Sequence, residues 1–142
     1  MRHNNVISVA IALCVTALFT IGSLPSASAS TPIPVTITAV YDFSTFPDVT
    51  GTFTTTGALT ISGTSTMHVD LNPFNGVRAH CVVTLTASNG TIVIDQQCQF
   101  ASSAPKGRWE IVSGTGAYGN LNGNGSLTMP PNTEAMTGVI FQ

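Results

Sequence analysis

Cys81 and Cys98 are the residues whose type and spacing most directly predict chemistry. They lie symmetrically about Asn89-Gly90, a dipeptide that favours a two-residue type I′ hairpin turn because both central residues need positive φ. Counting outwards from this turn places Ser88 opposite Thr91. The same count places Cys81 opposite Cys98, as a non-hydrogen-bonded pair whose Cα atoms lie close together. We therefore predict a disulfide between these strands, which would stabilise the fold by roughly 3 kcal/mol through loop-closure entropy.

Three further residues have side chains that ligate metals. His68, Asp70 and His80 lie on either side of a turn, and imidazole with carboxylate suits zinc or copper. Each of the three alternates with apolar residues that form the predicted buried face, so their side chains should point outwards. We therefore expect solvated surface residues here and no metal site.

The segment Gly114–Gly119 matches the pattern G-x-G-x-x-G and follows a predicted strand. A dinucleotide site needs a helix N-terminus next, to receive the pyrophosphate. The residues that follow, Asn120–Gly125, alternate Asn and Gly and cannot form that helix. We expect a tight turn and no nucleotide cofactor, and nothing in the sequence predicts a hydrolytic triad or a cysteine nucleophile.

The N-terminal residues have the organisation of a secretory signal peptide. A basic start is followed by an apolar run from Val6 to Ile21 and a small-residue stretch that ends at Ala29. The run is shorter than the ~20 residues of a membrane span. We predict a signal peptide over 1–29, a single domain over 30–142, and a secreted protein, extracellular or periplasmic. Removal of Cys14 would leave an even pair of cysteines in an oxidising compartment.

Charge excludes one class of partner. After residue 29 the cations are Arg78, Lys106 and Arg108, and they face six acidic residues. No basic stripe is present for a phosphate backbone, so we expect no nucleic-acid partner. We also expect no membrane span after processing.

Period-two alternation of apolar with Thr, Ser and Asn predicts strands throughout residues 30–142. We expect eight of them, near residues 35–43, 50–56, 59–70, 77–87, 91–100, 108–112, 121–129 and 136–141. Gly, Pro and β-branched residues interrupt every helical period, so almost no helix is expected. Eight short strands with regular turns predict an all-β fold, either a barrel or a sandwich.

The stretch Gly107–Tyr118, with its Gly-Thr-Gly-Ala-Tyr turn, runs into the glycine-rich segment Leu121–Gly125. It resembles the allene oxide cyclase and dirigent-like barrels, and most closely their small exported bacterial members. The resemblance implies an eight-stranded antiparallel barrel around an apolar cavity, often trimeric in the plant enzymes. It also implies that the cavity shapes a reactive intermediate for cyclisation or coupling.

Dirigent-type sites place acidic residues inside the barrel. Here Asp42, Asp70 and Asp95 all have outward parity, so none of them is expected in the interior and no catalytic residue is transferred. Polar or large residues on the inward faces are instead the candidates for a ligand site. They are Tyr41, Ser65, Met67, Gln96, Phe100 and Trp109.

Two functions follow. The first is a secreted barrel that holds a small apolar molecule and steers its cyclisation or isomerisation by confinement, with Gln96 and Tyr41 as polar anchors. The second is a non-catalytic secreted module, structural or for surface interaction, with a filled core. Inward glycines such as Gly63 and Gly125 favour free space, but they equally suit bends in a filled barrel.

Overall fold

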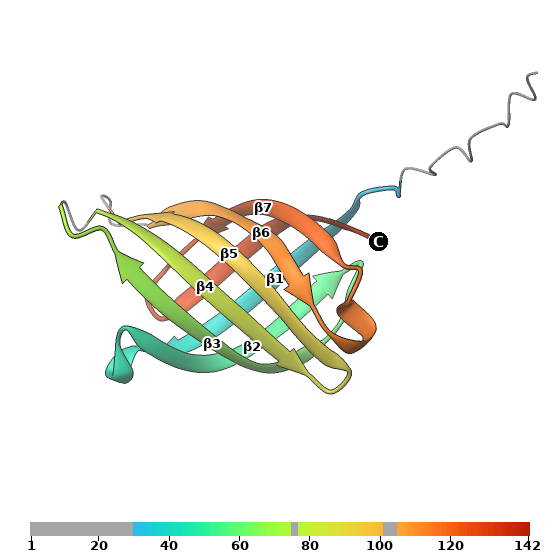
Figure 1. Ribbon diagram of the computed structural model, residues 1–142, viewed down its shortest axis with the longest axis horizontal. Helices are drawn as coiled ribbons and strands as arrows, with labels where there is room; N and C mark the ends of the chain where they lie inside the picture. The colour runs from blue at the N-terminus through green and yellow to red at the C-terminus, as the bar shows by residue number, and fades with distance from the viewer. Residues whose placement is uncertain (1–29, 75–76, 101–104) are drawn as a thin grey trace, which may run out of the picture.

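The computed structural model describes residues 30–74, 77–100 and 105–142, which form one closed antiparallel barrel (Figure 1). Each strand pairs with the next in sequence, and the first pairs with the last. The strands are β1 Ile33–Asp42, β2 Asp48–Gly57, β3 Ser62–Leu71, β4 Arg78–Ala87, β5 Gly90–Gln99, β6 Lys106–Gly114, β7 Asn122–Thr128 and β8 Thr133–Phe141. The predicted all-β, eight-stranded barrel is confirmed.

Buried and more exposed residues alternate along the strands that form the barrel wall. Along β4, the residues Ala79, Cys81, Val83 and Leu85 are buried, and the residues between them are half-buried or exposed. The same period holds in the other strands, because successive side chains of a strand point to opposite faces. Apolar side chains from all eight strands therefore meet in one core inside the barrel.

Helical structure in the described residues is limited to two short 3₁₀ turns, η1 Phe43–Thr45 and η2 Gly116–Tyr118. The second of these is the segment that matches G-x-G-x-x-G, and β7 follows it in place of a phosphate-binding helix. Among the described residues, no helix is both long and apolar enough to cross a bilayer.

The predicted register of the β4–β5 hairpin is wrong by two residues. Ala87 pairs with Gly90, so Ser88 and Asn89 form the loop and Cys81 lies opposite Gln96. The turn is held by η2, where the amide of Ala117 donates to the carbonyl of Asn89 at 3.0 Å. Because a shift of two residues preserves parity, both cysteines still point inwards.

Glycines on the inward faces mark close packing. A Cβ at Gly63 would overlap the carbonyl oxygen of Thr86, and one at Gly125 would overlap that of Thr137. A Cβ at Gly138 would lie 2.8 Å from the indole ring of Trp109. At these positions neighbouring backbone or ring atoms occupy the space that an L side chain would need, so these glycines do not open a cavity.

Candidate functional site

Glu134 is a carboxylate inside the barrel, and it lies outside the strand expected at residues 136–141. Its side chain is 1% exposed. It is the second residue of β8, which begins at Thr133, three residues before the predicted start. Glu134 alternates with Met136 and Ile140, both of which are buried. A strand that began at Thr133 would have predicted the inward carboxylate.

Tyr41 is the hydrogen-bond partner of Glu134. Its hydroxyl donates to Oε2 of Glu134 at 3.2 Å, and its side chain is 5% exposed. Strands β1 and β8 are neighbours, with Ala39 opposite Glu134. The two side chains therefore meet diagonally across a strand pair that closes the barrel.

Two buried polar atoms near this pair have no hydrogen-bond partner. They are Oε1 of Glu134 and Oγ of Ser65. Ser65 lies in one row with Gly51 and Tyr41, across β3, β2 and β1. A buried polar atom without a hydrogen-bond partner costs about 1–3 kcal/mol. This part of the interior therefore has more polar atoms than the protein's own hydrogen bonds satisfy.

Burial sets the ionisation of both groups. Loss of solvation raises the pKa of Glu134 to about 7, although the nearby Gln96 amide and Tyr41 hydroxyl favour the ionised form and lower it in part. The pKa of Tyr41 is also raised, first by burial and then by the charge of Glu134. Near neutral pH, Glu134 exchanges a proton readily and Tyr41 stays a neutral donor.

Gln96 connects the carboxylate to the two cysteines. Its amide Nε2 donates to Sδ of Met136 at 3.4 Å, and its Oε1 accepts from Sγ of Cys98 at 3.9 Å. Cys81 and Cys98 are free thiols with their Sγ atoms 3.8 Å apart. The hydrogen bond with Cys81, followed by burial, raises the pKa of the Cys98 thiol. The disulfide between the two cysteines stays a prediction.

The other predicted ligand-site residues lie apart from this hydrogen-bonded group or only partly inside. Met67 is buried at 2% exposure. Trp109 is buried too, and its indole N–H donates to the carbonyls of Ser126 at 3.1 Å and Thr137 at 3.3 Å. Phe100 is half-buried against the core. Of the six residues, the structure brings Tyr41, Ser65 and Gln96 together around Glu134.

The outward-facing histidines form cross-strand pairs with acids. Nδ1 of His68 lies 2.5 Å from Asp48, and Nε2 of His80 lies 2.5 Å from Asp95. Asp70 is the register partner of His80, but no contact joins all three predicted ligand types. Within the part of the chain that the structure describes, no group of three or more His, Cys, Asp or Glu is arranged to hold a metal ion.

The interior arrangement is suited to acid–base chemistry. A carboxyl group with a pKa near the working pH can both take and return a proton, which is the condition for general acid–base catalysis. A neutral tyrosine hydroxyl can donate to a developing oxyanion. Both groups are held in a low-dielectric interior, where such interactions are strongest.

One contact path links this interior to solvent. The ring of Tyr41 packs edge-on against Phe43, with centroids 6.1 Å apart at 69°. Phe43 lies in η1 and is 40% exposed. Tyr41 thus contacts both the buried Glu134 carboxylate and the partly exposed Phe43.

Comparison with known families assigns the chain to a family but gives no information about its chemistry. Residues 48–137, from the start of β2 into β8, match a family described as "Protein of unknown function (DUF3224)". A search of curated proteins found no match to this chain. The resemblance to allene oxide cyclase and dirigent-like barrels is compatible with the barrel fold, and neither comparison tests it further.

Proposed function

The chain belongs to the family described as Protein of unknown function (DUF3224), and we propose that it is a secreted barrel whose interior binds a small, mainly apolar molecule and transfers a proton within it. One observation carries this proposal. Glu134 is buried in an apolar core, with its Oε1 unpartnered and its Oε2 bonded to Tyr41. A carboxylate in that setting destabilises the fold, and a ligand that donates a hydrogen bond to it would recover the lost energy.

The reaction class follows from the groups present. Glu134, as the carboxylate, takes a proton from a carbon next to a carbonyl, while the Tyr41 hydroxyl donates to the enolate oxygen. Glu134, now the acid, returns the proton to a second carbon. The sum is an isomerisation that consumes no oxidant and needs no cofactor. Cyclisation by confinement, the activity implied by the resemblance, would use the same interior.

The apolar core sets the ligand's character. The buried apolar side chains of the same core include Met67, Met136 and Leu127, all at most 2% exposed. A ligand there must be mainly apolar, with one or two oxygen atoms for Glu134 and Ser65. It would enter past Tyr41 and Phe43, whose rings pack edge to face.

Native mass spectrometry tests this function. The protein is purified from its own host, and its mass is measured under gentle conditions and again after denaturation. An extra mass that leaves on unfolding, and that is lost in Glu134→Gln but kept in Glu110→Gln, supports the proposal. Glu110 is exposed, so its replacement makes the same chemical change outside the barrel.

The second candidate function is a non-catalytic module with a filled core. It is favoured by the close packing at Gly63 and Gly125. An apo mass in every preparation, together with Gln96→Leu stabilising the fold, would support it. Replacement of a buried polar group by an apolar one of similar volume stabilises a core that has no ligand to bind.

A further inference from the structure

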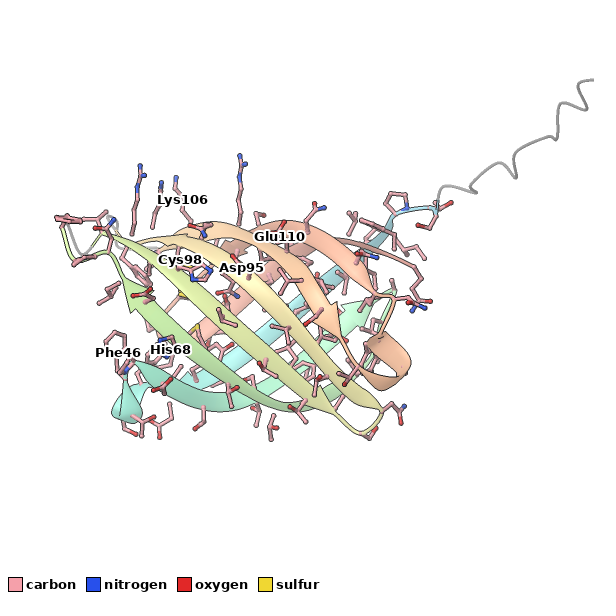
Figure 2. All side chains as sticks on the ribbon, in the orientation of Figure 1. Phe46, His68, Asp95, Cys98, Lys106 and Glu110 are labelled. Carbon is pink, nitrogen blue, oxygen red and sulfur yellow. The ribbon has the colours of Figure 1, made fainter. Side chains whose placement is uncertain are left out.

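The cations of the described chain gather on one outer face of the barrel. In residues 30–74, 77–100 and 105–142 they are Arg78, Lys106 and Arg108 alone. All three are exposed and lie on β4 and β6 near one end of the barrel, and Lys106 projects away from it (Figure 2). The other outer faces that the structure describes carry no lysine or arginine.

The strand register places the three cations in two adjacent rows. One row runs across β4 to β7 as Arg78, Gln99, Lys106 and Thr128. The next outward row runs across β5 to β7 as Gln97, Arg108 and Ser126. With strands about 4.8 Å apart and outward residues about 6.7 Å apart along a strand, the three cations are spaced by roughly 7–12 Å.

No carboxylate neutralises these cations. In the part of the chain that the structure describes, the ion pairs join His68 to Asp48 and His80 to Asp95, and none includes an arginine or lysine. The nearest acids are Asp70, which lies in the Arg108 row across β3 and β4, and Glu110 and Asp95, which face each other in the next outward row. The three cations thus face solvent without an ion pair to any of these carboxylates.

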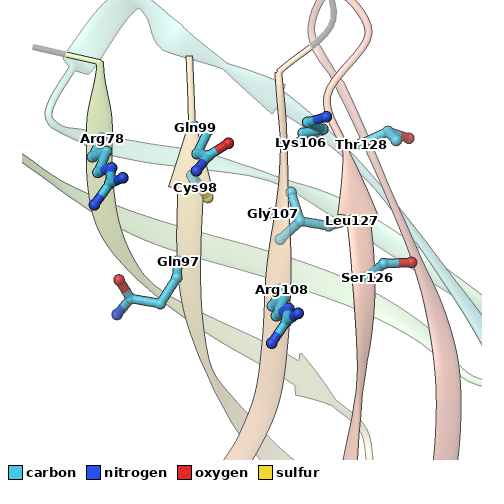
Figure 3. Close-up of a pocket in the computed structure, with 10 residues that line it drawn as sticks. All are labelled: Arg78, Gln97, Cys98, Gln99, Lys106, Gly107, Arg108, Ser126, Leu127 and Thr128. Atoms are coloured by element: carbon cyan, nitrogen blue, oxygen red, sulfur yellow. The ribbon is translucent and has the colours of Figure 1, made fainter. Parts of the chain in front are cut away.

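The two rows border a groove of about 520 Å³ (Figure 3). Its floor between the rows is formed by Gly107 and Leu127. Gln97 and Gln99 lie between Arg78 on one side and the β6 cations on the other. None of the described residues that line the groove is aromatic.

We propose that this groove binds an acidic oligosaccharide. Guanidinium groups hold carboxylate and sulfate oxygens through paired hydrogen bonds, and the spacing of the cations suits acid groups on successive sugars. Side-chain amides and the Ser126 and Thr128 hydroxyls would bond the sugar hydroxyls between them. Nucleic acid is disfavoured, because single strands need aromatic platforms for their bases.

The groove is independent of the interior site. Arg78, Lys106 and Arg108 point outwards, and Glu134 is enclosed by the barrel wall. Loss of sugar binding would therefore leave the proposed proton transfer untouched, and loss of the interior ligand would leave the groove untouched.

Titration with two sugars tests the proposal. A heparin tetrasaccharide carries sulfates and carboxylates, and an oligogalacturonate tetramer carries carboxylates only. Binding is followed at low ionic strength by calorimetry and by the fluorescence of Trp109, the single tryptophan, which follows Arg108 in β6. We expect at least one sugar to bind, with an affinity that falls as salt rises. Which of the two binds identifies the acid group.

Variants locate the site. Arg78→Gln, Lys106→Gln and Arg108→Gln should each weaken binding by about tenfold, as expected for loss of one charge-assisted contact. Thr54→Glu is the matched control, because it changes net charge by the same amount on exposed β2 across the barrel. Absence of binding by both sugars would overturn the proposal. It would also be overturned if Thr54→Glu weakened binding as much, or if an oligothymidylate of equal charge bound more tightly than either sugar.

Discussion

The hydroxyl oxygen of Tyr41 lies 3.2 Å from Oε2 of Glu134, and neither side chain is more than 5% exposed. This contact joins β1 to β8, the strand pair that closes the barrel. It is also a hydrogen bond that favours the ionised form of the buried carboxylate. The buried carboxylate therefore lies where backbone pairing of β1 with β8 closes the barrel.

Replacing Glu134 with Gln should remove most of the pH dependence of stability near neutrality. The folded pKa of Glu134 is about 7 against an ordinary 4.5, so the folded state holds the proton more tightly. Stability is then greatest below the unfolded pKa and is lost as pH rises through the folded one. The difference corresponds to about 3 kcal/mol, and Glu134→Gln should keep this stability at high pH.

Urea unfolding at about pH 5 and pH 8 measures this effect, since its midpoint follows stability. Glu110→Gln serves as the control, because it removes an exposed carboxylate and should behave like the unaltered protein. An unchanged pH slope in Glu134→Gln would show that the carboxylate is not the titrating group.

Replacing Tyr41 with Phe should raise the pKa of Glu134 further above about 7. The Tyr41 hydroxyl favours the ionised carboxylate and lowers its pKa, and phenylalanine cannot donate. Loss of this bond should also destabilise the fold by about 1–3 kcal/mol where Glu134 is ionised. The carbon chemical shift of the Glu134 carboxyl group, followed by NMR against pH, reports the change directly.

The second tyrosine of the chain supplies the comparison for this experiment. Tyr118 is buried in η2, which lies in the connection between β6 and β7. It makes no contact with Glu134. Tyr118→Phe should leave the Glu134 titration where it was. An equal displacement in both variants would mean that the pKa responds to general loosening of the barrel.

Alternation of residue types was sufficient to predict the eight strands and most of the buried faces. Parity places Tyr41, Ser65 and Gln96 inside, because burial depends only on whether a position is odd or even within a strand. The β4–β5 register could not be obtained in this way. A two-residue slip keeps every side chain on its face, and the register is fixed by contacts from η2 far along the chain.

Glu134 was missed for a related reason. The sequence Pro130-Pro131-Asn132 indicates a turn, and a charged residue two positions later is usually exposed. The pairing of Ala39 with Glu134 extends β8 towards that turn and carries the carboxylate inwards. The inward direction of the Glu134 side chain is thus set by long-range pairing of β8 with β1, which the local sequence does not reveal.

Replacing Gly125 with Ala should destabilise the barrel by about 2 kcal/mol. A Cβ there would overlap the Thr137 carbonyl oxygen and lie 2.7 Å from Cα of Gly138, so the backbone must shift, and overpacking of this kind costs about 1–3 kcal/mol. Gly119→Ala is the matched control. Its nearest contact would be 3.6 Å away and its φ is −59°, so its effect should stay within about 0.5 kcal/mol. Equal midpoints for both variants in urea would show that the strands separate easily at Gly125.

Cys81 and Cys98 should form a disulfide when the protein folds in an oxidising compartment. Their Sγ atoms are 3.8 Å apart, so the two side chains need to close by only about 2 Å. The two thiols lose two protons and two electrons to a disulfide oxidant, which is reduced to two thiols, and the chain mass falls by the mass of two hydrogen atoms. The bridge should stabilise the fold by roughly 3 kcal/mol.

Mass spectrometry and urea unfolding with and without reductant measure the two effects of the bridge. A variant with both cysteines replaced by alanine controls for direct effects of the reductant and should be indifferent to it. Both thiols reacting with a thiol reagent in the unfolded, exported protein would contradict the prediction.

Because Cys98 donates to the Gln96 side chain at 3.9 Å, bridge formation removes that donor. The Gln96 amide is then left with one sulfur contact fewer beside Glu134, so the oxidised protein should also show a Glu134 titration different from that of the reduced one.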